Sequence, residues 1–417
     1  MKHSFRNKEK QYLYLEPYTF SVMAGNDSLI YNSLNHTILE YRDSAMIAGV
    51  VRNLEDSGTG FLAPVDLLSS DKIIRALISD IKCSFSGDIV SCREENKPLI
   101  TRPKPIIKNY PPPKDFPSFS ADDYLRNLCF FVNQDKHQLC SEYRYAAQQF
   151  SCLSYNPLEY SELPLEKIFN SCSFLSGSSG LVLDFSGSDL SRYSQADSLI
   201  SGIRKLMLKV NFHLPLPCHD PSILSRLLKL GNSRISLYIT FPGGFSALQE
   251  IRQQPGYIKK QKKIDLNFII RSLKEYKEVS EQLKEPGDEK VFLLPYYDGN
   301  NRDFFRDNVY LSGEDILNLK PNQQQIFSRS LINEHLYGRM FIKTNGDAFA
   351  NLNHEALGNL DENSISELVK KELNSGKSWN LTRMQVKPCM DCLYRIFCPP
   401  ISNYELVTGE YNFCDVL

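Results

Sequence analysis

The chain has 417 residues, of which 42% are apolar and 23% charged, a composition typical of globular proteins. Its 48 basic residues balance 49 acidic ones, which argues against broad electrostatic binding to nucleic acid or to an anionic membrane. The first residues are polar, and no apolar run approaches the roughly 18 residues that a membrane span needs. We therefore predict a cytoplasmic protein with reduced thiols and with neither a nucleic-acid nor a membrane partner.

Residues 1–96 are predicted to form a small β+α domain. Strand-like segments at 18–23 and 28–31 flank the turn-forming segment 24–27, a pattern typical of a hairpin, and 37–41 continues the strand pattern. Helical periodicity follows at 43–55 and 70–81, with Ser70 or Asp71 as the cap of the second helix. An exposed hairpin edge can accept a peptide as an added strand. We favour simple packing of the hairpin over this role.

A proline-rich segment separates this domain from the rest of the chain. Prolines crowd residues 97–119, which excludes a helix or a central strand and favours a stiff, extended linker. We place a domain boundary there.

Residues 120–324 alternate short apolar runs with helical stretches. The predicted strands are 128–133, 181–186, 207–212, 235–241, 265–270 and 290–296, and the predicted helices lie near 194–206, 220–231, 245–253 and 274–284. This alternation indicates βαβ units and a parallel sheet, so the fold class is α/β. Six repeats predict a partial (β/α)6 TIM-type barrel rather than a closed barrel of eight.

Residues 325–417 form the predicted C-terminal domain. Segments 339–343 and 348–350 flank an Asn-Gly turn, which is a strong signal for a hairpin. A helix is predicted near 363–374, and an irregular cysteine-rich end follows it.

Four of the eleven cysteines have the spacing of metal ligands. They read Cys389-x2-Cys392-x5-Cys398, with Cys414 further on. Two cysteines separated by two residues can point both sulfurs at one ion across a tight turn, and two more complete a tetrahedral or cubane site. Spacing alone suits zinc as well as iron–sulfur, because both accept four thiolates.

The remaining cysteines and histidines carry weaker signals. Seven cysteines scattered over the first half are interpreted as small buried apolar side chains: Cys83, Cys92, Cys129, Cys140, Cys152, Cys172 and Cys218. His213 with Cys218 and His219 could supply ligands of a second metal site, but no fourth ligand lies near in the sequence. We interpret that segment as structural.

The tail resembles the SPASM domain of radical-SAM peptide maturases, which carries auxiliary [4Fe–4S] clusters. The resemblance is carried by residues 388–392 (PCMDC) and 398–405 (CPPISNYE). Where the family pattern has further cysteines, this chain has Asn351 and Ser402, and residues 325–345 contain none. The resemblance implies that the ligands of the first auxiliary cluster are lost. It implies that Cys389, Cys392, Cys398 and Cys414 hold the second cluster.

The predicted barrel resembles radical-SAM enzymes with the catalytic motif missing. The family places Cys-x3-Cys-x2-Cys after the first strand, and here Lys136, Cys140 and Tyr143 stand at those positions. Gly187-Ser188-Asp189 partly matches the Gly-Gly-Glu turn that holds the SAM amino group in that family. The resemblance therefore implies one [4Fe–4S] cluster in the tail and no functional SAM site.

The whole chain is similar to the pseudo-radical-SAM proteins of Gly-Gly-leader peptide modification systems. That resemblance implies a non-catalytic accessory protein that binds a radical-SAM maturase, a ribosomal precursor peptide, or both. Two alternatives remain open at this stage. One is an enzyme with unrelated chemistry in the barrel pocket. The other is an adaptor protein whose tail is stabilised by a single zinc ion.

Overall fold

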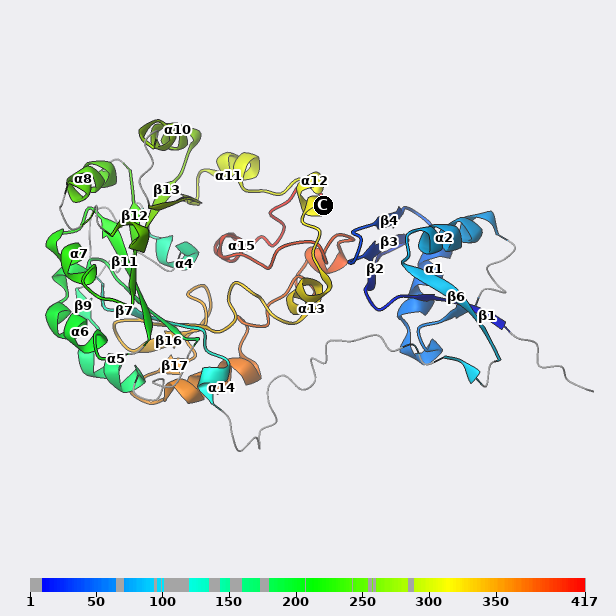
Figure 1. Ribbon diagram of the computed structural model, residues 1–417, viewed down its shortest axis with the longest axis horizontal. Helices are drawn as coiled ribbons and strands as arrows, with labels where there is room; N and C mark the ends of the chain where they lie inside the picture. Colours follow the sequence, from blue (N-terminus) through cyan, green and yellow to red (C-terminus); the bar gives the residue numbers. More distant parts are fainter. Residues whose placement is uncertain are drawn as a thin grey trace, which may run out of the picture.

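The computed structural model describes residues 10–64, 71–93, 96–98, 100, 120–134, 143–150, 160–172, 180–206, 208–241, 243–253, 257, 260–283 and 289–416. A larger body with a parallel sheet and a smaller N-terminal unit lie at opposite ends, and C-terminal elements lie between them (Figure 1). Almost all of the predicted linker 97–119 lies outside the described residues.

The N-terminal unit contains two antiparallel sheets and two helices. One sheet has the order β5-β1-β6 and the other β2-β3-β4. The strands are β1 (Lys10–Leu15), β2 (Thr19–Ala24), β3 (Asp27–Asn32), β4 (Ile38–Tyr41), β5 (Ala63–Pro64) and β6 (Gly87–Cys92), and the helices are α1 (Ala45–Glu55) and α2 (Lys72–Cys83), with the short η1 (Ser57–Thr59) after α1. The predicted hairpin is confirmed as β2–β3, and its turn uses Gly25 at a positive φ of 62°. Asp71 caps α2 by accepting from the N–H of Ile73, one of the two predicted caps.

The β2-β3-β4 sheet is apolar on both faces. Ile30 and its neighbours on one face join the core formed with α1 and α2. Val22, Leu29 and Tyr31 on the other face pack against the C-terminal tail. Because successive strand residues point to opposite faces, one short sheet serves two cores.

Six parallel strands form most of the main sheet. They are β7 (Asn127–Phe131), β10 (Val182–Ser186), β11 (Lys209–Leu216), β12 (Ser233–Ile239), β13 (Ile264–Ile270) and β14 (Lys290–Pro295), and each pairs with the next in chain order. All six correspond to predicted strands, which confirms an α/β fold with a large parallel sheet. The order follows from short crossovers that return each strand beside its predecessor.

Helices cover the outer face of this sheet (Figure 1). They are α5 (Leu165–Cys172), α6 (Ala196–Ile203), α7 (Ser222–Leu227), α8 (Gly243–Arg252) and α10 (Leu273–Gln282), and the last four confirm the predicted helices. Alternate strand residues such as Leu183, Phe185 and Phe212 point into this core. The other strand residues line the inner face, beside which lies the short α4 (Ala146–Phe150).

Smaller elements complete the connections of this body. They are η4 (Ala121–Asp123), η5 (Leu190–Arg192), η6 (Gln261–Lys263), and the two-stranded pair β8 (Asn133–Gln134) and β9 (Ser161–Glu162). No helix within the described ranges has the length and apolar character that a bilayer crossing requires.

The tail joins the main sheet at its other edge. After α11 (Arg302–Asn308), α12 (Gly313–Asn318) and α13 (Gln323–Leu331) come β15 (Arg339–Ile342), β16 (Asp347–Phe349), β17 (Gly358–Asn359), α14 (Ile365–Ser375), η7 (Cys389–Asp391) and α15 (Asn403–Thr408). β15 pairs parallel with β7, while β15, β16 and β17 pair antiparallel. The predicted hairpin and the predicted helix near 363–374 are thereby confirmed. The predicted boundary at 324/325 falls within α13.

Candidate metal centre in the tail

Two of the predicted ligands lie on one tight turn. Cys389 begins η7, and the N–H of Cys392 donates to the Cys389 carbonyl at 3.0 Å. Both side chains are buried, with exposed fractions of 4% and 5%. The turn that the Cys-x2-Cys spacing predicts is therefore formed.

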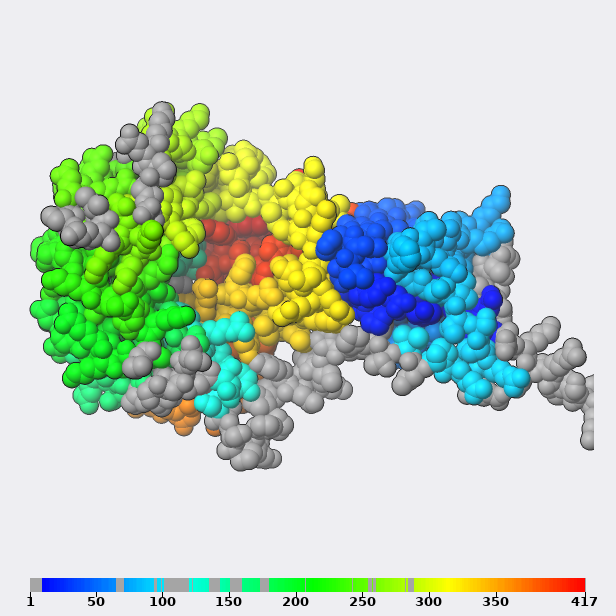
Figure 2. All heavy atoms as spheres, viewed as in Figure 1, coloured from blue at the N-terminus to red at the C-terminus, as the bar shows by residue number. Residues whose placement is uncertain are grey.

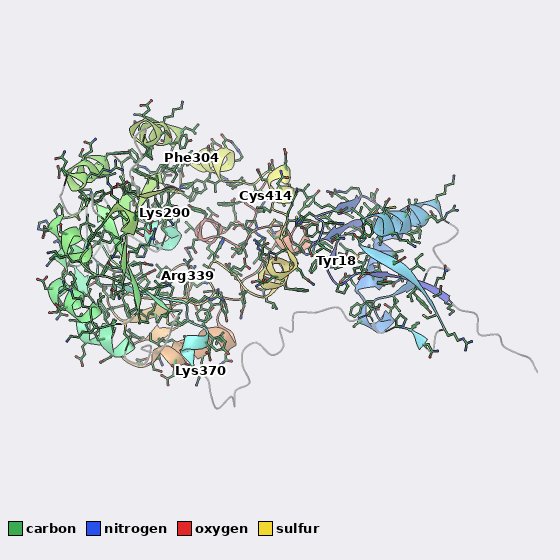
Figure 3. All side chains as sticks on the ribbon, viewed as in Figure 1. Tyr18, Lys290, Phe304, Arg339, Lys370 and Cys414 are labelled. Carbon is green, nitrogen blue, oxygen red and sulfur yellow. The ribbon has the colours of Figure 1, made fainter. Side chains whose placement is uncertain are left out.

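The other two ligands come from separate segments. Cys398 directly precedes Pro399, and Cys414 lies beside Leu311 through an isolated parallel bridge. Both are partly buried, and all four tail cysteines are free thiols. Cys414 lies near α12, on the side of the tail that faces the N-terminal unit (Figure 3).

The four thiols share one electrostatic neighbourhood. Burial raises the pKa of the Cys398 thiol to about 12, and the other three tail cysteines add to the shift while Arg383 opposes it. Burial also raises the pKa of Cys414, with contributions from Cys389 and Cys392. Thiolates crowded in this way repel one another, so a cation among them would be strongly favoured.

Hydrogen-bond donors already point at two of the sulfurs. The backbone N–H of Tyr394 donates to Cys392 Sγ at 3.4 Å, and Arg383 Nη1 donates to Cys389 Sγ at 3.4 Å. The Cys389 thiol itself donates to the Tyr411 carbonyl at 2.9 Å. Burial raises the pKa of Cys389, and Arg383 counteracts this. Donors of this kind stabilise thiolate ligands and orient them.

Arg383 links the pieces of the site, and the sequence analysis did not identify it. Its Nε donates to the Pro399 carbonyl at 2.6 Å, and its Nη1 donates to Glu405 Oε1 at 2.9 Å and to the Tyr411 carbonyl at 2.8 Å. The Glu405 side chain is almost fully buried. A lone arginine gives no signal in a sequence, but the capping-box pattern from Ser402 to Glu405 could have marked its partner.

The sulfurs do not form a ready cage. In the part of the chain that the structure describes, no group of three or more His, Cys, Asp and Glu side chains is arranged to hold a metal ion. The donor chemistry nevertheless fits a four-thiolate zinc or iron–sulfur site, because the four thiols are free and two of them receive N–H donors. Binding would require the side chains to converge.

An amide network occupies two positions where the resemblance expects cysteines. Asn351 is 2% exposed, and its Nδ2 donates to Asn403 Oδ1 at 2.8 Å. Asn403 Nδ2 in turn donates to the Gln149 carbonyl on α4 at 3.2 Å. Ser402 caps α15 in a capping box with Glu405. These side chains hold the tail against α4 by hydrogen bonds.

Tyr143, the described position of the three aligned with the catalytic motif, lies in an aromatic core. Of the three positions aligned with the catalytic motif, Lys136 and Cys140 lie outside the described residues. Tyr143 is 1% exposed, and its ring centroid lies 5.2 Å from that of Tyr296. The Tyr143 hydroxyl accepts from the Phe241 N–H at 3.2 Å. Tyr143 thus packs as a structural side chain.

The turn that partly matches the SAM-binding motif is satisfied internally. Asp189 accepts from the Ser191 N–H at 2.9 Å, from the Ser191 hydroxyl at 2.6 Å and from the His219 N–H at 2.6 Å. A Cβ at Gly187 would lie only 2.4 Å from Asn133 Oδ1, so the turn needs glycine there. The Asp189 carboxylate thus joins its own loop to the loop after β11.

A polar chain runs across the inner face of the sheet. Asp184 accepts from Asn127 Nδ2 at 2.8 Å and from Asn211 Nδ2 at 2.9 Å. His213 Nε2 lies 3.4 Å from Asp184 Oδ2, and His213 Nδ1 lies 3.1 Å from the Tyr238 hydroxyl. Burial opposes ionisation of Asp184, but His213 and the two amides outweigh it and lower the pKa of the carboxyl.

The remaining sequence interpretations have mixed outcomes. Cys129 and Cys172 are buried as expected, Cys92 and Cys218 are partly buried, and Cys83 is exposed, so that prediction was wrong for Cys83. Its position in the last turn of α2 turns the side chain toward solvent. Cys140 and Cys152 lie outside the described residues. Neither His213 nor Cys218 and His219 form a metal-binding group within the described ranges.

No protein-family model matches the chain, and no curated protein matches it in sequence. Solved structures that match include SuiB of Streptococcus suis bound to S-adenosylmethionine, with 10% identity over 96% of this chain and 97% of that chain and a TM-score of 0.49. SuiB alone matches with 12% identity over 97% and 100%, at a TM-score of 0.43. SuiB bound to precursor peptide SuiA matches with 14% identity over 96% and 98%, at a TM-score of 0.44.

Proposed function

We propose that this protein is a non-catalytic accessory factor in the maturation of a ribosomal peptide. Its main sheet would be a partial barrel of the radical-SAM type, and its tail a SPASM-like domain with one [4Fe–4S] cluster. Cys389, Cys392, Cys398 and Cys414 would hold the cluster, which would supply a cross-link for the irregular tail or a centre for electron transfer. The partners would be a precursor peptide, a radical-SAM maturase, or both.

The observation that carries this proposal is the chemical setting of the four tail thiols. They come from three segments that are separate in sequence. For each thiol with a raised pKa, at least one other tail cysteine contributes to the increase. Arg383 and the Tyr394 N–H supply donors to sulfur. A metal ion would favour the thiolate form of these buried thiols, and four thiolates are a donor set that an iron–sulfur cluster or zinc accepts.

Two further observations support a non-catalytic role. Tyr143 is packed into an aromatic core at a position where the resemblance expects a cluster ligand. The carboxylate oxygens of Asp189 accept hydrogen bonds from Ser191 and His219 of this chain. Both residues stabilise the fold at places where a radical-SAM enzyme would bind its cofactors.

Arg383 would balance the charge of the loaded site. Four thiolates around one cluster carry excess negative charge, and the Arg383 guanidinium lies against Cys389 in a buried position. Glu405 fixes the orientation of that guanidinium through two hydrogen bonds. The pair would therefore hold the donor geometry around the sulfur constant.

A precursor peptide would add as a strand to the N-terminal unit. The packing that we favoured for the hairpin is what the contacts show, since one face of the β2-β3-β4 sheet lies on the tail. At β2, Arg395 Nη1 already donates to the Met23 carbonyl. In the described residues β4 has no strand on its outer side, so its edge is the place where an extended peptide would pair.

The test is metal analysis after anaerobic purification, on the wild-type protein, on Cys392→Ser and on the control Cys83→Ser. Cys83 is an exposed free thiol outside the site. The proposal expects about four irons and four sulfides per chain in the wild type and in the control, with loss in Cys392→Ser. About one zinc ion per chain without sulfide would instead favour the adaptor protein whose tail is stabilised by zinc. About eight irons would overturn the non-catalytic role.

A second candidate function is chemistry on the inner face of the sheet. The hydrogen-bonded chain from Asp184 through His213 to Tyr238 favours it, because a carboxylate can hold an imidazole ready for proton transfer. A thermal-shift screen of small molecules on wild type and on His213→Gln would test this. Ligands that stabilise only the wild type would support an enzyme, and the absence of any such ligand would speak against one.

A further inference from the structure

We propose that metal binding in the tail controls the docking of the N-terminal unit. The docking loop, residues 393–397, is bracketed by Cys392 and Cys398, and with Ile316 of α12 and Ile326 of α13 it forms the surface on which the β2-β3-β4 sheet rests. The inference rests on the proposed metal site and adds a regulatory role to it. In Figure 2 the N-terminal unit abuts the elements that surround the C-terminal segment.

Apolar contacts make up the centre of this interface. The docking loop contributes Leu393, Ile396 and Phe397 to a cluster with Val22, Leu29 and Tyr31 of the N-terminal sheet. The rings of Tyr31 and Phe397 lie edge to face with centroids 4.7 Å apart. The same cluster includes the partly buried ligands Cys398 and Cys414. The metal site and the docking surface thus share one core.

Polar contacts fix the rim of the interface. The Tyr394 hydroxyl donates to Glu40 at 3.0 Å and accepts from Arg42 Nη2 at 2.6 Å. Arg395 Nη1 donates to the Met23 carbonyl at 3.3 Å and to the Cys392 carbonyl at 2.8 Å. Tyr394, Arg395 and Phe397 of the docking loop therefore each contact the N-terminal unit directly.

The two cysteines at the ends of the loop make it responsive to metal. Binding of Cys392 and Cys398 to one metal centre would close a short loop and remove conformational freedom from the five residues between them. Without metal, the loop is held only by its packing and hydrogen bonds, and docking would lose part of its preorganisation. Because such coupling is reciprocal, docking must in turn strengthen metal retention.

The N-terminal unit can undock without unfolding. Its own core is formed on the other face of the sheet by Ile30 with Leu13 and residues of α1 and α2. Val22 points to the tail, whereas its neighbour Met23 packs toward that inner core. A substitution at Val22 therefore disturbs the interface and spares the core of the unit.

The first experiment measures hydrogen–deuterium exchange over residues 19–32. The samples are the metal-loaded protein, the same protein stripped by a chelator, Cys392→Ser, and Cys83→Ser as control. We expect exchange about tenfold faster in the stripped protein and in Cys392→Ser, within the usual range of coupling between sites. Cys83→Ser should exchange at the same rate as the metal-loaded wild-type protein.

The second experiment measures metal release to a chelator by Val22→Lys. We expect release about tenfold faster than in wild type. The matched control is Val291→Lys, at an exposed valine on β14 that is remote from the tail. Tyr394→Phe, which keeps the ring and loses only the hydroxyl contacts, should show a smaller acceleration of the same sign.

The outcomes separate the two proposals. A wild-type chain that holds no metal would overturn the proposed function and this inference together. Bound metal with unchanged exchange after stripping would overturn the inference alone, as would Val22→Lys and Val291→Lys releasing metal at the same rate. Faster exchange and faster release in the named variants would support it.

Discussion

The tail and the loop after β7 show two fates of cysteine-ligand positions. In the tail, four thiols remain, and Arg383 and a backbone N–H point at their sulfurs. After β7, one such position is Tyr143, whose ring is packed among other aromatic rings and whose hydroxyl accepts a hydrogen bond from the Phe241 N–H. The first environment combines apolar packing with hydrogen-bond donors to sulfur, while the second is a closely packed aromatic cluster.

This difference shows what surroundings accompany a metal-ligand position and what surroundings accompany a position that only stabilises the fold. A ligand residue needs donors and charge around it, because a thiolate is costly in an apolar core. A residue that stabilises the fold needs close packing instead. The surroundings of a side chain thus distinguish the two roles better than its place in a motif does.

The largest effect is expected from Arg383→Gln. The change leaves Glu405 buried without its cation, which should cost about 3–5 kcal/mol of unfolding free energy and accelerate metal loss. Thermal unfolding and metal content would measure both effects. Arg302→Gln is the control, since its ion pair with Glu410 is exposed and should be dispensable. Equal melting temperatures for the two variants would refute the role assigned to Arg383.

Tyr143→Ala should destabilise the protein strongly and leave the metal site intact. Removing a buried aromatic ring costs about 3–5 kcal/mol through the cavity that remains. Tyr143→Phe keeps the ring and should cost only about 1 kcal/mol for the lost hydrogen bond. Denaturant titration would give both values. If Tyr143→Ala emptied the tail of metal while still folded, the two regions would not be independent.

Asn351→Ala tests the amide network between the tail and α4. Its loss leaves Asn403 short of a partner in a partly buried setting, so a cost of about 1–3 kcal/mol is expected. Asn308→Ala, at an exposed asparagine of α11, serves as the matched control. A stability loss no greater than that of the control would show that the network is replaceable by water.

Ser402→Ala should give the smallest change. Loss of the N-cap of α15 should cost about 1 kcal/mol, and the loosened Glu405 should slightly increase metal release. Ser364→Ala removes an equivalent capping box from α14 and should match it in stability alone. Identical metal release from the two variants would show that Glu405 is held by Arg383 and not by the cap.

Local patterns predicted most of the elements. The alternation of apolar runs and helices gave the six parallel strands and the helices between them, because periodicity reports which side of an element is buried. The Asn-Gly turn and the Asp71 cap were also correct, since each depends on a few neighbouring residues. The strand β1 was missed, because Lys10–Leu15 has no turn signal before it.

The candidate site likewise has one part that the local sequence predicted and one part that it did not. The spacing of Cys389, Cys392 and Cys398 pointed to one site, and the turn at η7 bears out that local part. Arg383 could not be found, because its partners Tyr411 and Glu405 are distant in sequence and only packing brings them to it.

The sequence by itself determined the α/β class, the order of the strands and the grouping of the cysteines near the end of the chain. Only the tertiary structure decided that β15 adds to β7, that Asn351 binds Asn403 and that the docking loop supports the N-terminal sheet. The reason is physical. Periodicity and turn chemistry act between near neighbours, whereas burial and hydrogen bonding between distant segments exist only once the chain has folded.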